Sequence, residues 1–184
     1  MVGQQIAVYL VDTVFGFLVI LLLARFHFQW LRVPFRNPVG EFVLALTNWI
    51  VRPARRVIPG LAGLDLATLL LAWVVQAISL WLQSLIVGAE PSVLALAAVA
   101  AVDLVRFSVY ILIAAIFAVV LFSWINPYAP LAPVFNAFTN PFLRPFRRLL
   151  PPIGGVDLTP MLLGIVLYIL LVVLTYLRAA AAGL

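Results

Sequence analysis

Four long apolar segments, separated by polar or proline-rich stretches, dominate the pattern of hydrophobic and polar positions along the chain. We assign them to residues 6–24, 64–87, 107–125 and 158–177, with Trp30 as an alternative end of the first. Each is close to the roughly 20 residues that a helix needs to cross a bilayer. An isolated strand cannot satisfy its backbone in lipid, and no period-two alternation indicates a barrel. The pattern therefore predicts an all-α, polytopic membrane protein with four transmembrane helices.

The third apolar region is less simple than the others. It extends from Ser92 to Ile125, which is too long for one untilted span of about 20 residues. Asp103 and Arg106 interrupt it. We therefore divide the region there into an alanine-rich lead-in, residues 92–102, and the span itself.

The composition supports a membrane protein and excludes several kinds of chemistry. Of the 184 residues, 66% are hydrophobic and only 9% are charged, whereas a soluble domain averages about 25% charged. The absence of cysteine rules out disulfides and, with His27 as the only histidine, zinc, iron–sulfur and bis-histidine haem sites within one chain. Serines in the spans have no histidine or lysine to activate them. We expect no enzyme activity and no cofactor.

The arginines predict the topology of the chain. The sequence contains no lysine, and nine of its eleven arginines fall in two connectors, residues 25–63 and 126–157. Each connector joins an odd span to the next even span, so both lie on one side of the membrane. Because basic residues in short loops mark the cytoplasmic side, we predict cytoplasmic connectors and both termini outside. We expect no nucleic-acid partner.

The chain contains an internal repeat. With an offset of 92, residues 47–66 align with residues 139–158, and ten of these twenty positions are identical. Asp12 and Asp103 align within one residue, and Trp30 and Trp124 each close an odd span. We therefore predict two units, residues 1–91 and 92–184, each made of a span, a basic connector and a span. An even number of spans per unit makes the two helical hairpins parallel rather than inverted.

The repeated segment carries a motif that resembles a known family. From Asn140 to Pro160 the chain reads N-P-x-L-R-P-x-R-R-L-L-P-x-x-G-G-x-D-x-x-P. This pattern is similar to that of the YggT family, small bacterial membrane proteins with YlmG relatives in Gram-positive bacteria and plastids. The first copy departs from it at Trp49, Ala62 and Thr68. The resemblance implies a bacterial plasma (inner) membrane protein linked to tolerance of osmotic upshift. Other relatives are linked to haem attachment on a cytochrome or to cell division.

The connectors combine an amphipathic stretch with a basic turn. We expect Pro38–Val51 to form a helix in the headgroup plane. Pro53 and Pro145 disfavour a helical conformation at the preceding residue, so we predict a helix break and a short basic turn at each. Six arginines at these turns are candidates for docking lipid or partners: Arg52, Arg55, Arg56, Arg144, Arg147 and Arg148. Alternatively, they only fix the topology or line an ion path.

A glycine–aspartate corner precedes each even span. Glycine permits a tight, left-handed turn, and an aspartate caps the helix that follows. The candidate capping and structural residues are Gly63, Asp65, Gly154, Gly155 and Asp157. An ion pair from each aspartate to the arginines of its own repeat would hold the connector against the span.

Two aspartates near the spans give a rival hypothesis. An ionisable residue at membrane depth marks a functional site by default. Asp12 and Asp103 are equivalent in the two repeats, so one alternative is a shared cation site near the repeat axis. The other is an interfacial position, or pairing of Asp103 with Arg106 three residues away. Gln76 and Gln83, seven apart, lie on one face and are expected to hold helices together.

We thus predict a membrane interaction or assembly factor in osmotic-stress or envelope homeostasis. Its partners would be anionic lipid headgroups, with a homo-oligomer and a second membrane protein as further candidates. The alternative is an oligomeric ion channel or transporter that contributes to ion uptake under osmotic upshift.

Overall fold

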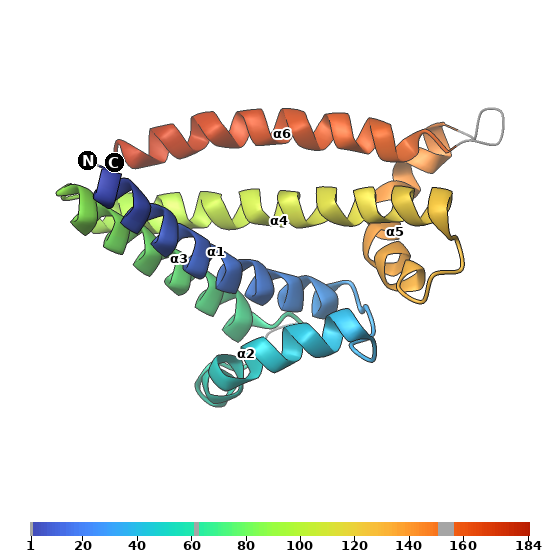
Figure 1. The fold of residues 1–184 in the computed structure, drawn as a ribbon, viewed down its shortest axis with the longest axis horizontal. Helices are drawn as coiled ribbons and strands as arrows, with labels where there is room; N and C mark the ends of the chain where they lie inside the picture. The colour runs from blue at the N-terminus through green and yellow to red at the C-terminus, as the bar shows by residue number, and fades with distance from the viewer. Residues whose placement is uncertain (1, 61–62, 151–156) are drawn as a thin grey trace.

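A computed structural model describes residues 2–60, 63–150 and 157–184 and consists of helices joined by short connections (Figure 1). The elements are α1 (Val2–Trp30), α2 (Pro38–Val57), α3 (Leu66–Val87), α4 (Val93–Ile125), α5 (Ala132–Leu149) and α6 (Thr159–Ala182). Four of them, α1, α3, α4 and α6, are long and apolar enough to cross a membrane. This confirms the predicted all-α membrane fold.

The four long helices alternate in direction. Figure 1 shows both termini and the α3–α4 turn at one end of the bundle, and α2 and α5 toward the other end. The turn begins at Gly88, whose φ of 73° places it in the left-handed region that glycine tolerates. Ser92 then caps α4 by accepting a hydrogen bond of 3.0 Å from the backbone of Ala95. Each half of the chain is therefore a long hairpin with a shorter helix at its bend.

Two apolar clusters hold the bundle together. The first joins α1 to α3 and includes Val19, Leu22 and Ala72, with Leu104 contributed by α4. The second joins α4, α5 and α6, and also takes in Phe28 from the end of α1. Because each cluster includes a residue from the other half of the chain, the two repeats pack on each other rather than standing apart.

The predicted division of the third apolar region is wrong: α4 is one helix from Val93 to Ile125. This stretch contains no proline or glycine, so nothing in its backbone chemistry forces a break. The charges at its centre do not interrupt it either. Asp103 and Arg106 form an ion pair of 3.2 Å on one face of the helix, so each charge is compensated in place.

The first and last helices extend beyond their assigned spans. The first continues past Ala24 through Arg25 to its alternative end, Trp30, and the last continues past Leu177 as far as Ala182. In both cases an arginine lies within the helix and has polar partners on another helix. Arg25 bonds to α2 and Arg178 bonds to α4.

The predicted helix breaks at Pro53 and Pro145 are also wrong, because α2 and α5 both continue through their prolines. A proline removes one hydrogen bond, here that to the carbonyl of Trp49 in α2. Trp49 is 66% exposed, so that carbonyl lies on the outer side of the helix. The ladder then resumes, with the backbone N–H of Ile58 donating to Ala54 at 2.9 Å.

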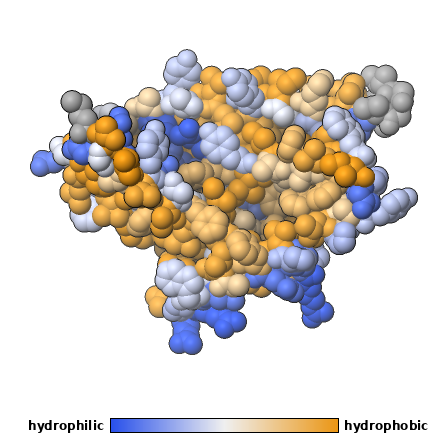
Figure 2. Space-filling model, viewed as in Figure 1, coloured by the Kyte–Doolittle hydropathy of each residue, from blue (hydrophilic) through white to orange (hydrophobic). Residues whose placement is uncertain are grey.

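The surface agrees with a membrane environment. Figure 2 shows hydrophobic side chains over much of the visible face of the long helices, and hydrophilic side chains gathered below, where α2 lies. The buried face of α2 consists of Gly40, Val43, Thr47 and Val51, at helical spacing. Its other side carries exposed aromatic and charged residues, including Phe42 and Arg52. The connector helices are therefore amphipathic elements at the end of an apolar bundle.

Candidate functional site

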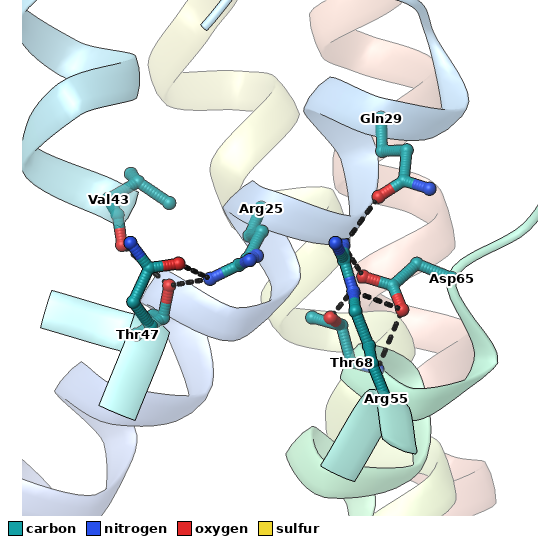
Figure 3. A network of polar contacts seen from close by, with 8 residues as sticks. Arg25, Gln29, Val43, Thr47, Arg55, Asp65 and Thr68 are labelled. Carbon is teal, nitrogen blue, oxygen red and sulfur yellow. Dashed lines mark hydrogen bonds and ion pairs between the residues drawn. The ribbon is translucent and has the colours of Figure 1, made fainter. Parts of the chain in front are cut away.

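The corner between α2 and α3 is built from one glycine and one aspartate. Gly63 has a φ of 80°, which permits the sharp reversal into α3. Asp65 is the N-cap residue of α3 and accepts from the backbone N–H of Thr68 at 3.3 Å. Arg55 of α2 donates from Nε to Oδ1 of Asp65 at 3.3 Å and from Nη2 to Oδ2 (Figure 3). The bidentate pair ties the end of the connector to the start of the span.

The second repeat builds the same corner from its equivalent residues. Nε of Arg147 donates to Oδ2 of Asp157 at 3.0 Å. The backbone N–H and the hydroxyl of Thr159 donate to Oδ1 of Asp157 at 3.0 and 2.6 Å. Asp157 thus satisfies the first donor of α6, although it precedes the N-cap residue, Leu158. The proposed turn glycines, Gly154 and Gly155, lie outside the described residues.

Both capping aspartates have lowered pKa values. Burial by itself raises the pKa of Asp65, but the hydrogen bonds from Arg55 and Thr68 and the charge of Arg55 together outweigh burial. The pKa of Asp157 is lowered in the same way, with burial opposed by hydrogen bonds from Thr159 and Arg147. Each corner therefore holds an ionised carboxylate at neutral pH.

A buried arginine joins α1 to α2. Arg25 is only 3% exposed, and its Nη1 donates to Oγ1 of Thr47 at 2.8 Å and to Oδ1 of Asn48 at 3.0 Å (Figure 3). Its Nε is buried with no hydrogen-bond partner among the described residues. Since both partners are neutral, a positive charge is buried next to the basic end of α2. The sequence pattern places Arg25 in the basic connector and gives no sign of these buried contacts.

Four connector arginines point away from the fold. They are exposed, and within the described residues they take part in no salt bridge: Arg52, Arg56, Arg144 and Arg148. In each connector the two lie four residues apart, so their side chains project from one helical face. The six candidate docking arginines thus divide into two that lock the corners and four that are open to the surroundings.

Asp103 is the centre of a cluster inside the bundle. It is 4% exposed and accepts from Arg106 at 3.2 Å and from Arg178 at 2.7 Å. Nε2 of Gln76 in α3 also donates to it, at 3.1 Å. One carboxylate thus faces two guanidinium groups, and the cluster carries a net positive charge.

The structure does not bring Asp12 into this cluster. Asp12 is exposed on α1 and accepts a hydrogen bond of 3.3 Å from Gln83. Gln76 and Gln83 both lie on α3, seven residues apart, which corresponds to about 10 Å along the axis. Both glutamines join helices, as their spacing indicated. The two aspartates, however, bond to opposite ends of this pair and face different surroundings.

Sequence reasoning missed two partners, Arg178 for Asp103 and Gln29 for Arg55. Arg178 is 75 residues from Asp103, and only the helix register reveals the contact. Nη2 of Arg55 donates to Oε1 of Gln29 at 2.8 Å, across 26 residues. The lone histidine, His27, is 8% exposed and packs against Phe138, with ring centroids 6.1 Å apart. Among the described residues no group of three metal-ligating side chains occurs.

Fold and site together define the class: a multi-pass membrane protein made of two hairpin units whose connector helices carry arginine–aspartate corners. The family model described as CCB3/YggT matches two stretches, residues 4–86 and 98–178, each containing one such unit. The chain belongs to the CCB3/YggT family.

Relatives in two bacteria support this assignment. The chain is 34% identical to the uncharacterized protein PA0392 of Pseudomonas aeruginosa over 160 residues, which cover 84% of this chain and 80% of the relative. It is 32% identical to the uncharacterized protein YggT of Escherichia coli K12 over 164 residues, covering 88% and 85%. No solved structure matches the chain.

Proposed function

We propose that this protein is a non-catalytic docking factor of the bacterial plasma membrane, acting in osmotic-stress and envelope homeostasis. In the proposed orientation both connectors face the cytoplasm, and their exposed arginines bind anionic lipid headgroups and so position the protein for its membrane partners. The observation that carries the proposal is made at the C-terminal part of each connector helix: Arg55 or Arg147 is paired with the corner aspartate, while the two arginines that flank it at positions 52 and 56, or 144 and 148, are exposed and form no salt bridge among the described residues.

Electrostatics supports this proposal. An arginine near an anionic leaflet gains about 1 kcal/mol from the surface potential. The corner ion pairs fix the ends of α2 and α5 against the spans, so the backbone positions from which the exposed arginines project are fixed. Preorganised charges lose less conformational entropy on binding than mobile ones.

The rival proposal of ion conduction has less support. A shared cation site needs two free carboxylates that face each other, but Asp103 is already paired with two arginines and Asp12 is exposed. A net positive cluster repels cations. We therefore expect vesicles containing the purified protein to show no potassium or sodium flux above that of empty vesicles. Flux that disappears in the Asp12→Asn/Asp103→Asn variant would replace docking with transport.

A fluorescence experiment tests lipid docking directly. Trp49 is exposed and lies on the same face of α2 as Arg52 and Arg56. With Trp49 as the only tryptophan, phosphatidylglycerol with brominated acyl chains should quench it more strongly than brominated phosphatidylcholine at equal mole fraction. The Arg52→Gln/Arg56→Gln variant should lose the difference. Equal quenching by both lipids in the unsubstituted connector would contradict the proposal.

A growth experiment tests the cellular role. In a strain that lacks its own relative, the protein should restore growth after an osmotic upshift. Replacement of all four exposed arginines by glutamine should prevent this, although the variant still accumulates in the membrane. Full restoration by the variant would show that the exposed arginines are not the docking site.

A further inference from the structure

A cavity of about 830 Å³ opens beside the ion pair of the second repeat, between α4, α5 and α6. This volume lies in the range of about 300–1,000 Å³ that is typical of ligand pockets. Apolar side chains of α4, including Phe117 and Trp124, line most of it, and Arg147 and Asp157 lie in its wall. Phe117 is 62% exposed and Trp124 is 79% exposed, so the cavity is open toward the surroundings of the bundle.

The first repeat has a longer side chain at the equivalent position. When Trp30 is aligned with Trp124, Gln29 corresponds to Ser123. Gln29 reaches Arg55 and accepts a hydrogen bond from it at 2.8 Å. Ser123 is shorter by two heavy atoms and lines the cavity instead.

The exposure of the corner aspartate also differs between the two repeats. In the first repeat the hydroxyl of Thr68 donates to Asp65, whose side chain is only 3% exposed. The residue that aligns with Thr68 is Pro160, which has no donor and lines the cavity, and the hydroxyl that bonds to Asp157 comes from Thr159 instead. The side chain of Asp157 is 34% exposed. The aspartate of the ion pair is thus buried in the first repeat and partly exposed in the second, while the two arginines are equally exposed, at 41%.

We propose that the cavity of the second repeat binds an anionic phospholipid, with its phosphate at Arg147 and an acyl chain along the α4 wall. This inference rests on the proposed docking of anionic lipids and names a specific site for it. Arg147 bonds to Asp157 through Nε and to Asn140 through Nη1. A guanidinium group has five donors in a planar fork, which suits a phosphate in addition to these partners.

The apolar wall selects a lipid rather than a free anion. Phe117 and Trp124 belong to a helix that is long and apolar enough to span the bilayer, so their exposed surfaces adjoin acyl chains. A small inorganic anion would leave this apolar surface uncovered. A phospholipid covers it and brings the phosphate to the polar end of the same cavity.

Trp124 serves as the reporter for the test. The other four tryptophans are changed to phenylalanine, and the full-length protein is reconstituted in phosphatidylcholine vesicles with brominated lipid. Brominated phosphatidylglycerol should quench Trp124 severalfold more strongly than brominated phosphatidylcholine at equal mole fraction. Equal quenching by the two lipids would overturn the proposal.

Matched variants separate this site from general effects. Arg147→Gln should abolish the preference at Trp124, and Arg147→Lys, which keeps the charge, should retain part of it. Ser123→Gln places the residue of the first repeat in the cavity wall and should also reduce the preference, even if Arg147→Gln fails to fold. Arg55→Gln, the same change at the corner of the first repeat, should leave it unchanged. A preference that survives both Arg147→Gln and Ser123→Gln would overturn the assignment.

Two further arms distinguish the remaining outcomes. If the Trp49 reporter shows a preference for phosphatidylglycerol and the Trp124 reporter does not, the cavity proposal fails while docking by the connectors stands. If neither reporter shows it, both proposals fail. Added inorganic phosphate should not change quenching of Trp124. Complete competition by phosphate would assign the cavity to a free anion and overturn its assignment to a lipid.

Discussion

Arg178, one turn before the end of α6, lies with its Nε 2.7 Å from Oδ1 of Asp103 in α4. The contact matters because the same carboxylate also bonds to Arg106 of its own helix and to Gln76 of α3. A single side chain therefore connects three of the four spans, and it connects the second repeat to the first. The apolar clusters supply most of the contact area, but this cluster fixes the register between helices.

Replacement of Asp103 by asparagine should be strongly destabilising. It leaves two arginines without their shared carboxylate, and losing one partner of a buried ion pair costs on the order of 3 kcal/mol. The free energy of unfolding should be measured by titration with sodium dodecyl sulfate, followed by circular dichroism.

The neighbouring arginines provide the controls for that measurement. The side chains of Arg106 and Arg178 are 25% and 38% exposed, and the loss of either leaves Asp103 paired with the other, so each replacement should cost less than Asp103→Asn. If Arg106→Gln destabilised the protein as much as Asp103→Asn, the carboxylate would not be the centre of the cluster.

The equivalent threonines Thr47 and Thr139 should respond differently to replacement by valine. Both are fully buried, and both donate to a backbone carbonyl one turn earlier. Among the described residues, Thr47 also accepts a hydrogen bond, from Arg25, whereas Thr139 accepts none from a side chain. Thr47→Val should therefore cost about 1–3 kcal/mol, because it leaves a buried charged donor with one partner fewer. Thr139→Val serves as the matched control, and an equal loss in both variants would show that Arg25 gains nothing from Thr47.

Gly63→Ala should destabilise the first corner. A residue with a side chain at a φ of 80° is strained by about 1–2 kcal/mol. Gly16→Ala is the control, because Gly16 lies within α1 and nothing lies within 4 Å of an added Cβ there. That change should be neutral or slightly stabilising, since alanine favours a helix. Thermal unfolding of both variants would show the difference, and similar melting temperatures would contradict it.

Because the pKa values of the corner aspartates are lowered, we expect the free energy of unfolding to fall at acid pH. The folded-state pKa of Asp65 lies below its ordinary value of 3.8. Its contribution is therefore fully present above that value and is lost as the pH falls through the folded-state pKa. Titration with detergent between neutral pH and about pH 3 should show a steeper loss of stability in the parent protein than in Asp65→Asn.

Asp157→Asn is the matched variant for the second corner. Its carboxylate is far more exposed than that of Asp65. Its removal should therefore reduce the dependence of the free energy of unfolding on acid pH less than Asp65→Asn does. Equal slopes for the two variants would mean that burial of the first corner adds nothing to its ion pair.

The sequence predicted those features that depend on local composition. Hydropathy located the four spans, and the repeat located both corners, since the spacing from Arg55 to Asp65 recurs from Arg147 to Asp157. Prediction from the sequence failed where a contact with a distant residue outweighs the local preference. Arg25 and Arg178 lie inside helices because partners on other helices compensate them, and a single sequence does not reveal those partners.

The predicted helix breaks at the prolines were wrong for a different reason. The local preference of proline against a helix interior was outweighed by the contacts that α2 makes on both sides of Pro53. Val51 is fully buried and Arg55 is held by Asp65. A backbone fixed on both sides of one missing hydrogen bond has little freedom to leave the helix.

Both chain ends lie at the same end of the bundle as the turn from Gly88 to Ser92. A linker that joined Leu184 to Met1 would therefore not have to cross the membrane, and the chain could instead be opened within that turn. Every span would keep its direction in such a circularly permuted protein. The order in which the two hairpins emerge from the ribosome is thus not dictated by the final arrangement, and either hairpin is topologically able to enter the membrane first.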